Sequence, residues 1–404
     1  MNWHTIDGVR NVVVVLTLMC SSAIIVARTA QNERLEKGAP SGAGTQAFVG
    51  VRPIAPPATP LPDEVASAGV TKFSFIAYGD TRSGAEPGVP GDGEVLHQLH
   101  NQLVSGMLVK IKAHASTPYP VRFVVQSGDA VLRGQDAAMW NVSFSPIIER
   151  LTGTGNVPYF FAVGNHDVTT MPPGDPGRAL GLHNTLTAMS KLIPPEGSPR
   201  RLSGYPTYTF GYGNLFVIML DSNIASDTFQ LAWVTDQLEH LDRSRYGHVI
   251  AVFHHPPFTS GLHGGSTIEP QSAAIRDLYA PLFRKHHVQM TIAGHDHLLD
   301  HWVERYMEGG VTFRRDDVVT GGGGAPIYTY TGEPDLSAYC AAGAGEHVRM
   351  EHLLKPGRTP EENPHHFLVV QVDGDRLSLV VEAIGGIPYA PYGGRSGVEL
   401  TDRQ

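Results

Sequence analysis

Cysteine is almost missing from this sequence, because its 404 residues include only two, Cys20 and Cys340. Cys20 lies in an apolar N-terminal segment that we expect to be removed during export, so the mature chain would keep Cys340 alone. A single cysteine cannot form an intramolecular disulfide, and this excludes the class of small exported domains held by disulfide frameworks. The folded chain therefore depends on the packing of its core.

Positive charge is also scarce. The chain has 30 Lys and Arg against 39 Asp and Glu, a formal net charge of −9. No basic stripe is available to contact the phosphates of a nucleic acid, and we expect no nucleic-acid binding surface. A covalent nucleophile is missing too, since there is no nucleophile elbow and Cys340 has no cluster of polar residues around it in the sequence.

Long hydrophobic runs are confined to the N-terminus. Arg10 precedes an apolar stretch that starts at Val12 and continues to Ala27. A basic residue, an apolar core and small residues after it are typical of an export signal. About 16 apolar residues are short for a membrane span. We therefore expect residues 1–27 to be a cleaved signal peptide and the protein to be secreted or periplasmic; the alternative is an uncleaved anchor through residues 10–27, with an extracytoplasmic domain.

Composition divides the rest of the chain. Residues 28–70 are rich in Ala, Gly and Pro, which predicts an extended linker, either a tether or a wrap. Residues 71–385 carry regular apolar patterns and are expected to form the one large domain, followed by a C-terminal tail at 386–404.

Within this domain, expected strands alternate with expected helices. The strands that precede polar clusters are predicted at 73–78, 121–125, 159–163, 249–253 and 288–293. Residues 168–204 show no clear period and are predicted to be a long excursion near the functional site. Short strands follow from residue 303 onwards, and Gly321–Gly324 is expected to interrupt them as a tight turn. The alternation predicts an α/β fold built from stacked β-α-β units.

Polar residues follow each of those five strands. The clusters are Gly79-Asp80, Gly128-Asp129, Gly164-Asn165-His166-Asp167, His254-His255-Pro256 and Gly294-His295-Asp296-His297. Ligands gather at the carboxyl ends of strands in such folds, and burying so many polar groups is costly unless something binds them. We expect these clusters to form one site.

The donor types in these clusters suit a metal. Carboxylates, an amide oxygen and imidazoles favour first-row transition metals over calcium or a thiolate zinc site, and the candidate ligands are Asp80, Asp129, Asn165, His254, His295 and His297. They suffice for two ions that share one carboxylate. Two ions about 3.5–4 Å apart can hold the attacking and leaving oxygens of a phosphoryl transfer.

The ordered set of Gly-Asp, Gly-Asp, Gly-Asn-His-Asp, His-x-Pro and Gly-His-x-His resembles the calcineurin-like metallophosphoesterase superfamily, which includes the purple acid phosphatases. The resemblance covers residues 71–385. It implies a four-layer α/β/β/α sandwich, here with a Pro-rich N-terminal extension. It also implies one metal held by Asp80, Asp129 and His297. A second metal would be held by the bridging Asp129 together with Asn165, His254 and His295.

The same resemblance implies roles for two further residues. His166 would face the phosphate, where it stabilises charge or protonates the leaving oxygen, and Asp167 would orient the His166 ring. His263 lies in a glycine-rich loop and is a candidate substrate contact. Residues 221–223 end a strand and are expected to support Asn165 or His254 by hydrogen bonds.

Two positions depart from the family pattern. Most relatives have His two residues after the first Asp, where this chain has Arg82, and purple acid phosphatases place Tyr three residues after the second, where this chain has Leu132. The first metal therefore lacks a protein ligand. Arg82 either binds a phosphate oxygen pair, as a substrate-binding and catalytic group, or forms a salt bridge to a carboxylate such as Asp129.

These observations predict an exported dinuclear phosphoesterase. It would use two transition-metal ions, iron, manganese or zinc, to hydrolyse small phosphate esters by attack of a metal-bound hydroxide. A phosphomonoesterase is favoured. A phosphodiesterase or nucleotidase of the same superfamily is the alternative within enzymes, and a non-catalytic metal- or phosphate-binding protein with a degraded first metal site is the alternative of another class.

Overall fold

The computed structural model describes residues 50–82, 96–168, 176–264 and 268–401. These ranges belong to one unit, Gly50–Gln404. The expected signal peptide, residues 1–27, and the first part of the expected linker lie outside the described residues. Among the helices of these four ranges, none is long and apolar enough to cross a membrane.

Two β-sheets form the centre of the described chain. In the first, six described strands lie in the order β13-β12-β11-β1-β2-β3. Their bounds are β1 Lys72–Tyr78, β2 Val121–Gln126, β3 Tyr159–Phe161, β11 His366–Asp373, β12 Arg376–Ala383 and β13 Gly397–Glu399. Strands β1, β2 and β3 run parallel, so their carboxyl ends lie at one edge. Strand β11 pairs antiparallel with β1, so a strand from the C-terminal part of the chain lies next to the first strand of the domain.

The second sheet has the order β10-β8-β9-β7-β6-β5-β4 among the described strands. Their bounds are β4 Tyr208–Tyr212, β5 Leu215–Met219, β6 His248–Val252, β7 Met290–Ala293, β8 Leu299–Glu308, β9 Val311–Thr320 and β10 Arg349–Leu354. Strands β5, β6, β7 and β9 are parallel, and β4–β5 and β8–β9 are antiparallel pairs.

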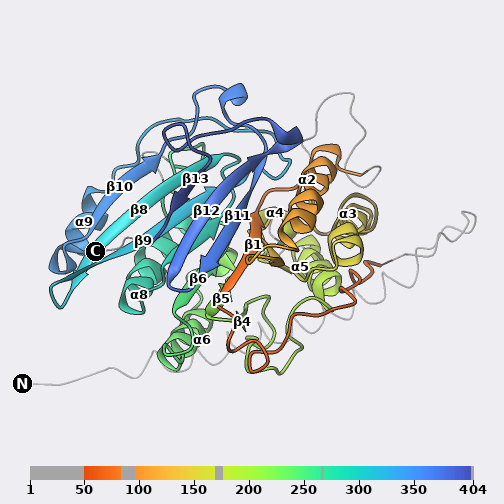
Figure 1. Ribbon diagram of the computed structural model, residues 1–404, viewed down its shortest axis with the longest axis horizontal. Coiled ribbons are helices and arrows are strands. Elements are labelled where there is room, and N and C mark those ends of the chain that lie inside the picture. Colours follow the sequence, from red (N-terminus) through yellow and green to blue (C-terminus); the bar gives the residue numbers. More distant parts are fainter. Residues whose placement is uncertain (1–49, 83–95, 169–175, 265–267, 402–404) are drawn as a thin grey trace, which may run out of the picture. The chain divides into compact units, whose positions relative to one another are not determined.

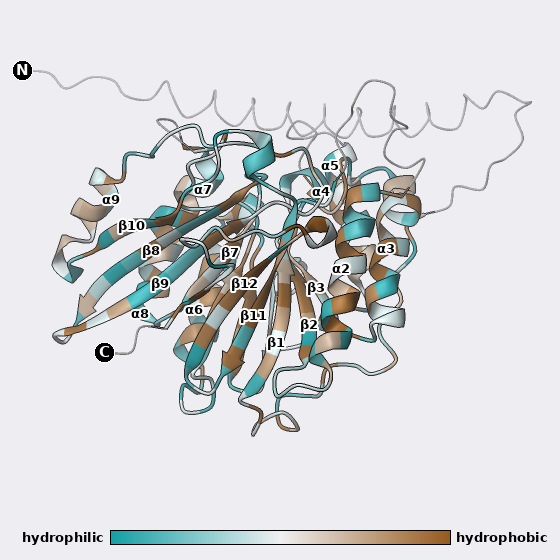
Figure 2. Ribbon diagram, turned by 45° about the horizontal axis from the view of Figure 1, so that its top comes forward, coloured by the Kyte–Doolittle hydropathy of each residue, from teal (hydrophilic) through white to brown (hydrophobic). Residues whose placement is uncertain are grey.

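Alternating side chains of the second sheet face two different cores. Val217 and Val252 join the cluster that contains Phe75 of β1, so they pack between the sheets. Phe216 and Phe253 belong to a separate cluster with residues of the outer helices. Both faces of the strands are therefore apolar, as Figure 2 shows by colour, and this explains why their sequences are nearly continuous hydrophobic runs.

Helices cover the outer face of each sheet (Figure 1). On the first sheet lie α2 Gln98–His114, α3 Ser145–Glu149 (between π-helical turns at Met139–Phe144 and Arg150–Thr154) and α5 Pro176–Met189. On the second lie α6 Thr228–Glu239, α7 Pro270–Ala274 and α8 Ala280–Lys285, the last two joined by a π-helical turn at Ile275–Tyr279. The layers follow the order helix, sheet, sheet, helix, which confirms the predicted α/β/β/α sandwich.

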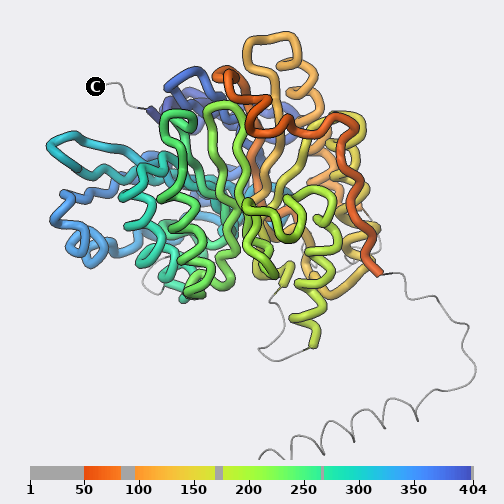
Figure 3. The backbone as a smooth tube through the Cα atoms, turned by 90° about the horizontal axis from the view of Figure 1, so that it is seen from below, coloured from red at the N-terminus to blue at the C-terminus, as the bar shows by residue number. Residues whose placement is uncertain are grey.

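Residues 50–70 wrap along this domain, as the red segment of Figure 3 shows. Ile54 is buried, and its amide donates to the Ala188 carbonyl at 2.9 Å. The Glu64 carboxylate accepts hydrogen bonds from Arg200 and Tyr246, each at 2.7 Å. This Pro-rich segment is therefore held against the domain by burial and by hydrogen bonds. It corresponds to the wrap alternative for this part of the expected linker.

Three segments differ from the sequence-based expectations. The expected excursion at 168–204 contains α5, whose buried residues include Gly181, Asn184 and Thr185, so no apolar period marks it. Helix α9 Ser337–Ala342 and strand β10 were not predicted. Strand β10 lies at the sheet edge and is largely exposed, so its sequence has no hydrophobic run.

The expected tight turn at Gly321–Gly324 is also wrong in detail. This segment leaves β9 and runs against the loops that end β1 and β7. A Cβ added at Gly323 would lie 2.2 Å from the Gly79 carbonyl oxygen, and one added at Gly321 would lie 2.2 Å from the Asp296 oxygen. The glycines are required because backbone approaches backbone here.

We therefore predict that Gly323→Ala destabilises the protein by about 1–3 kcal/mol, because the methyl group must displace the backbone before Asp80. Chemical denaturation measures the free energy of unfolding. Gly345→Ala is the matched control, since its Cβ would meet nothing within 4 Å. Equal stability of the two variants would contradict this account of the glycine segment.

Candidate metal centre

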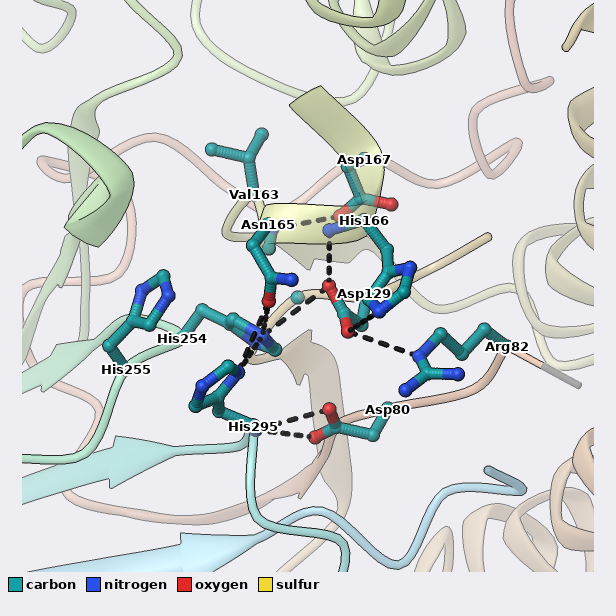
Figure 4. Close-up of polar contacts among 12 residues, drawn as sticks. Asp80, Arg82, Asp129, Val163, Asn165, His166, Asp167, His254, His255 and His295 are labelled. Atoms are coloured by element: carbon teal, nitrogen blue, oxygen red, sulfur yellow. Dashed lines mark hydrogen bonds and ion pairs between the residues drawn. The ribbon is translucent and has the colours of Figure 1, made fainter. Parts of the chain in front are cut away.

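The predicted ligands follow the carboxyl ends of strands from both sheets, and Figure 4 shows five of them together, Asp80, Asp129, Asn165, His254 and His295. Asp80 follows β1 and Asp129 follows β2, while Asn165 opens the short helix α4 Asn165–Val168 after β3. His254 follows β6, and His295 and His297 follow β7. All six are positioned by loops anchored to buried strands, which is why strand-end residues far apart in the sequence meet.

Three of these residues have a left-handed backbone. The φ angles are 60° at Asp80, 54° at Asp129 and 71° at His295. Such conformations cost about 1–3 kcal/mol each for residues other than glycine, and they persist where the surroundings determine them. Here the Asp80 amide donates to the Gly128 carbonyl at 3.0 Å, and the Asp80 carboxylate accepts the His295 amide at 3.0 Å. Backbone strain is thus concentrated at the candidate ligands.

The tightest part of the site is a cluster around the Asn165 side chain. Its Oδ1 lies 2.9 Å from His254 Nε2 and 3.1 Å from His295 Nδ1, and these two nitrogens are 3.1 Å apart. Asp129 Oδ1 is 3.3 Å from His254 Nε2. Three candidate ligand atoms therefore lie within 3.1 Å of one another, and Asp129 Oδ1 joins them through His254.

The opposite nitrogen of each imidazole faces an acceptor. His254 Nδ1 is 3.0 Å from the Ser127 carbonyl oxygen, to which it donates, and His295 Nε2 donates to Glu269 Oε2 at 2.8 Å. Burial lowers the pKa of His254 to about 3, so this ring is neutral near neutral pH. His254 Nε2 then directs a lone pair at the Asn165 and Asp129 oxygens, and His295 Nδ1 faces the same Asn165 oxygen.

Acceptors facing acceptors in a buried site are unfavourable without a cation between them. The mixture of imidazole nitrogen, amide oxygen and carboxylate oxygen suits a first-row transition metal. The spacings also fit, because ligands at about 2.0–2.2 Å from an ion lie about 3 Å from one another. This donor set fits one bound transition metal.

Neighbouring hydrogen bonds hold these ligands in place. Ser222 Oγ accepts the backbone amides of His254 and His255, at 3.1 and 2.9 Å. Asn223 Nδ2 donates to the Val163 and Gly164 carbonyls, at 3.4 and 3.3 Å. The expected support from residues 221–223 is therefore present for His254 and for the loop that carries Asn165.

Glu269 is a site residue that the sequence analysis missed. Its carboxylate contacts His295 Nε2 at 2.8 Å and His263 Nδ1 at 2.7 Å. The His263 ring lies against that of His295, with centroids 3.9 Å apart. Glu269 follows no strand and belongs to no motif, so only its side-chain contacts in the structure reveal it. His263 lies beside His295, and its contact with substrate stays a prediction.

The pKa values of the two central carboxylates, Asp80 and Asp129, shift in opposite directions. Burial alone would raise the pKa of Asp129, but His254, His166 and Arg82 hold this pKa below its ordinary value. Burial, reinforced by the negative charge of Asp129, raises the pKa of Asp80 well above its ordinary range. A bound cation near Asp80 would favour its ionised form.

The expected contact between Asp167 and the His166 ring is absent from the described site. Asp167 Oδ1 accepts the amides of Ala130 and Val131, at 3.0 and 3.2 Å, and Oδ2 accepts the Gly164 amide at 2.8 Å. His166 Nδ1 instead donates to a backbone oxygen, that of Leu132, at 2.9 Å. The physical reason is that Asp167 is fully buried and both of its oxygens accept backbone amides. Asp167 joins the two loops that carry Asp129 and Asn165.

Arg82 lies beside two of the residues expected to bind the first metal. Its Nε donates to Asp129 Oδ2 at 3.3 Å, and its Nη2 lies 3.4 Å from His297 Nε2. The salt-bridge alternative for Arg82 is the contact observed. Leu132, the other departure from the family pattern, packs against the main core.

Comparison with known proteins agrees with this arrangement. The family model described as "Calcineurin-like phosphoesterase" matches residues 97–299. The chain belongs to this family. The matched segment includes Asp129, Asn165, His254 and His295, whereas Asp80 and Arg82 precede it.

One relative in sequence and one in fold are purple acid phosphatases. "Probable purple acid phosphatase 20" of Arabidopsis thaliana is 26% identical over 187 residues, covering 45% of this chain and 40% of that protein. A purple acid phosphatase from yellow lupin (Lupinus luteus) seeds has a similar structure, with a TM-score of 0.57 and 16% identity over 82% of this chain and 54% of that one. The phosphoesterase described here thus spans about half or less of the length of these relatives.

In this phosphoesterase, we predict that Asp167→Ala lowers the free energy of unfolding by at least about 3 kcal/mol, because three buried amides lose their acceptor. Asp167→Asn keeps one acceptor oxygen and should have an intermediate effect. Denaturant titration of both variants, with His166→Ala as control, measures this. An Asp167→Ala protein that is as stable as wild type, with only its pH–rate profile changed, would restore the ring-orienting role.

Proposed function

We propose that this protein is a metal-dependent phosphoric ester hydrolase that acts on small-molecule phosphate monoesters. The observation that carries the proposal is the clustering of metal-binding atoms from Asp129, Asn165, His254 and His295, a donor set that suits a transition-metal ion. Membership of the phosphoesterase family and similarity to purple acid phosphatases support the reaction class.

An iron, manganese or zinc ion held by these four residues would supply Lewis acidity to a phosphoryl group and to the attacking water. Glu269 and the Ser127 carbonyl keep the two imidazoles in the tautomers that such binding needs. The resemblance implied that Asp80, Asp129 and His297 would hold the other ion, the first of the pair. Arg82 contacts two of these three residues.

His166 is the proposed proton donor. Its Nδ1 is committed to the Leu132 carbonyl, so Nε2 is the atom free to exchange a proton, and it lies 4.0 Å from Asp129 Oδ2. The side chain is partly exposed, which lets it reach a bound ester. Protonated Nε2 would donate to the leaving oxygen, so no covalent intermediate with the protein is needed.

The test compares aryl phosphate and bis-aryl phosphate hydrolysis with manganese, iron or zinc added. Wild-type protein should prefer the monoester, and Asn165→Ala should lower kcat/KM by at least about a hundredfold while remaining folded. Asp129→Ala should lose at least as much. Asn141→Ala, whose side chain binds Gly50 and Arg52, is the control and should keep full activity.

Each alternative function predicts a different result. Preference for the bis-aryl substrate would replace the monoesterase by a phosphodiesterase. Metal binding without turnover of either substrate would identify a binding protein. Full activity in protein that contains no transition metal would refute metal-dependent hydrolysis.

We also propose that residues 1–27 direct this enzyme out of the cytoplasm, because they combine Arg10 with an apolar stretch too short for an ordinary span. Intact-mass analysis of the full-length protein, expressed in a secreting host, should find a mature N-terminus shortly after Ala27 in the soluble extracytoplasmic fraction. Retention of residues 1–27 in a membrane fraction would instead support an anchor.

A further inference from the structure

The Arg82 guanidinium stands among the residues that the family pattern assigns to a first metal ion. It contacts Asp129 Oδ2 through Nε at 3.3 Å and His297 Nε2 through Nη2 at 3.4 Å. His297 Nε2 is itself 3.6 Å from Asp80 Oδ1. The guanidinium therefore approaches two of the three expected ligands, on the atoms that would face an ion.

The His297 tautomer makes this contact a hydrogen bond. Nδ1 donates to the Pro326 carbonyl oxygen at 2.7 Å, which leaves a lone pair at Nε2 of the neutral ring. Arg82 Nη2–H donates to that lone pair, as Nε–H does to Asp129. Two of the three ligand atoms that a first ion would need thus already accept from a group that carries a permanent positive charge and cannot itself bind a metal.

The surroundings enclose the Arg82 side chain, which is only 12% exposed. The Tyr328 ring stacks on His297, with centroids 4.1 Å apart and planes inclined by 17°, and the Tyr328 hydroxyl forms a hydrogen bond with Arg82. Tyr328 follows the glycine segment whose backbone is bound to Gly79 and Asp80. The arginine is therefore held by the fold at this position.

The cluster around Asn165 differs from the Arg82 position in its side-chain contacts. No Lys or Arg contact to it is recorded among the described residues, and Arg82 contacts Asp129 through Oδ2, not through the Oδ1 that lies near His254. One half of the centre offers the donor set of a transition-metal site, and the other half already contains a cationic side chain.

We propose that this centre binds a single transition-metal ion, at Asp129, Asn165, His254 and His295, and that the Arg82 guanidinium replaces the first ion of its family as a fixed cation. The inference rests on the proposed function only in requiring metal at the Asn165 cluster. Arg82 then contributes to phosphate binding by charge and by its outward N–H groups, and the substrate is held between one metal and one arginine.

The experiment is a titration of chelator-treated full-length protein with Mn²⁺ alone, followed by equilibrium dialysis and electron paramagnetic resonance. Wild type should bind one equivalent and show the spectrum of an isolated ion. His254→Ala should abolish this binding. His297→Ala should retain it within about threefold, because His297 is not a ligand of that ion.

Removing the arginine should create the second site. Arg82→His and Arg82→Ala should each bind a second equivalent at least tenfold more tightly than wild type, and Arg82→His should show a spectrum broadened by coupling between two ions. Arg133→Ala is the matched control, since Arg133 is exposed and pairs with Asp136. It should bind one equivalent. If the Arg82 variants fail to fold, the contrast between His254→Ala and His297→Ala in the wild-type background still decides the proposal.

Two equivalents of coupled Mn²⁺ in wild type, loss of the single ion on His297→Ala, or no gain in folded Arg82 variants would each overturn the proposal. Its failure is distinguishable from failure of the proposed function. A wild-type protein that binds two ions and hydrolyses phosphate esters refutes only the single-metal centre. One bound ion without hydrolysis refutes only the enzyme, and the absence of Mn²⁺ binding refutes both.

Discussion

The structure depends on one constraint: side-chain nitrogen and oxygen atoms of His254, His295, Asn165 and Asp129 are packed into one buried cluster. Each imidazole donates its other N–H outward, His254 to the Ser127 carbonyl and His295 to Glu269, so neither ring can turn to relieve the conflict. Asp129 and His295 both have left-handed backbone conformations at the loops that carry them. A cation bound among these side chains would offset the cost of burying them together, so metal binding would also stabilise the fold.

Much of the fold and of the candidate site could be predicted from the sequence. Buried parallel strands are continuous hydrophobic runs, and the residues after them share one edge of a sheet, so the strand pattern alone places Asp80, Asp129 and Asn165 near one another. Contacts that depend on loop paths could not be predicted. Glu269 reaches His295 from a segment without a motif, and Asp167 turned out to bind backbone amides, because nothing in Gly-Asn-His-Asp indicates where its donors lie. Helix α5 was hidden because small and polar residues form its buried face.

Arg82 shows how one substitution can change the chemistry of a shared architecture. The family pattern has a metal ligand at this position. This chain has a cationic side chain instead, hydrogen-bonded to Asp129 and His297. A metal ion can exchange and can activate water, whereas a guanidinium keeps its charge and offers directional donors to phosphate oxygens. The centre would then combine one exchangeable cation with one that is encoded in the chain.

The most direct test of this account is anomalous diffraction from crystals of the protein soaked with Mn²⁺ and inorganic phosphate. The account predicts one anomalous peak, about 2.0–2.3 Å from the side chains of Asp129, Asn165, His254 and His295, with the Arg82 guanidinium in contact with the bound phosphate. Two peaks bridged by Asp129, with Arg82 displaced, would contradict it.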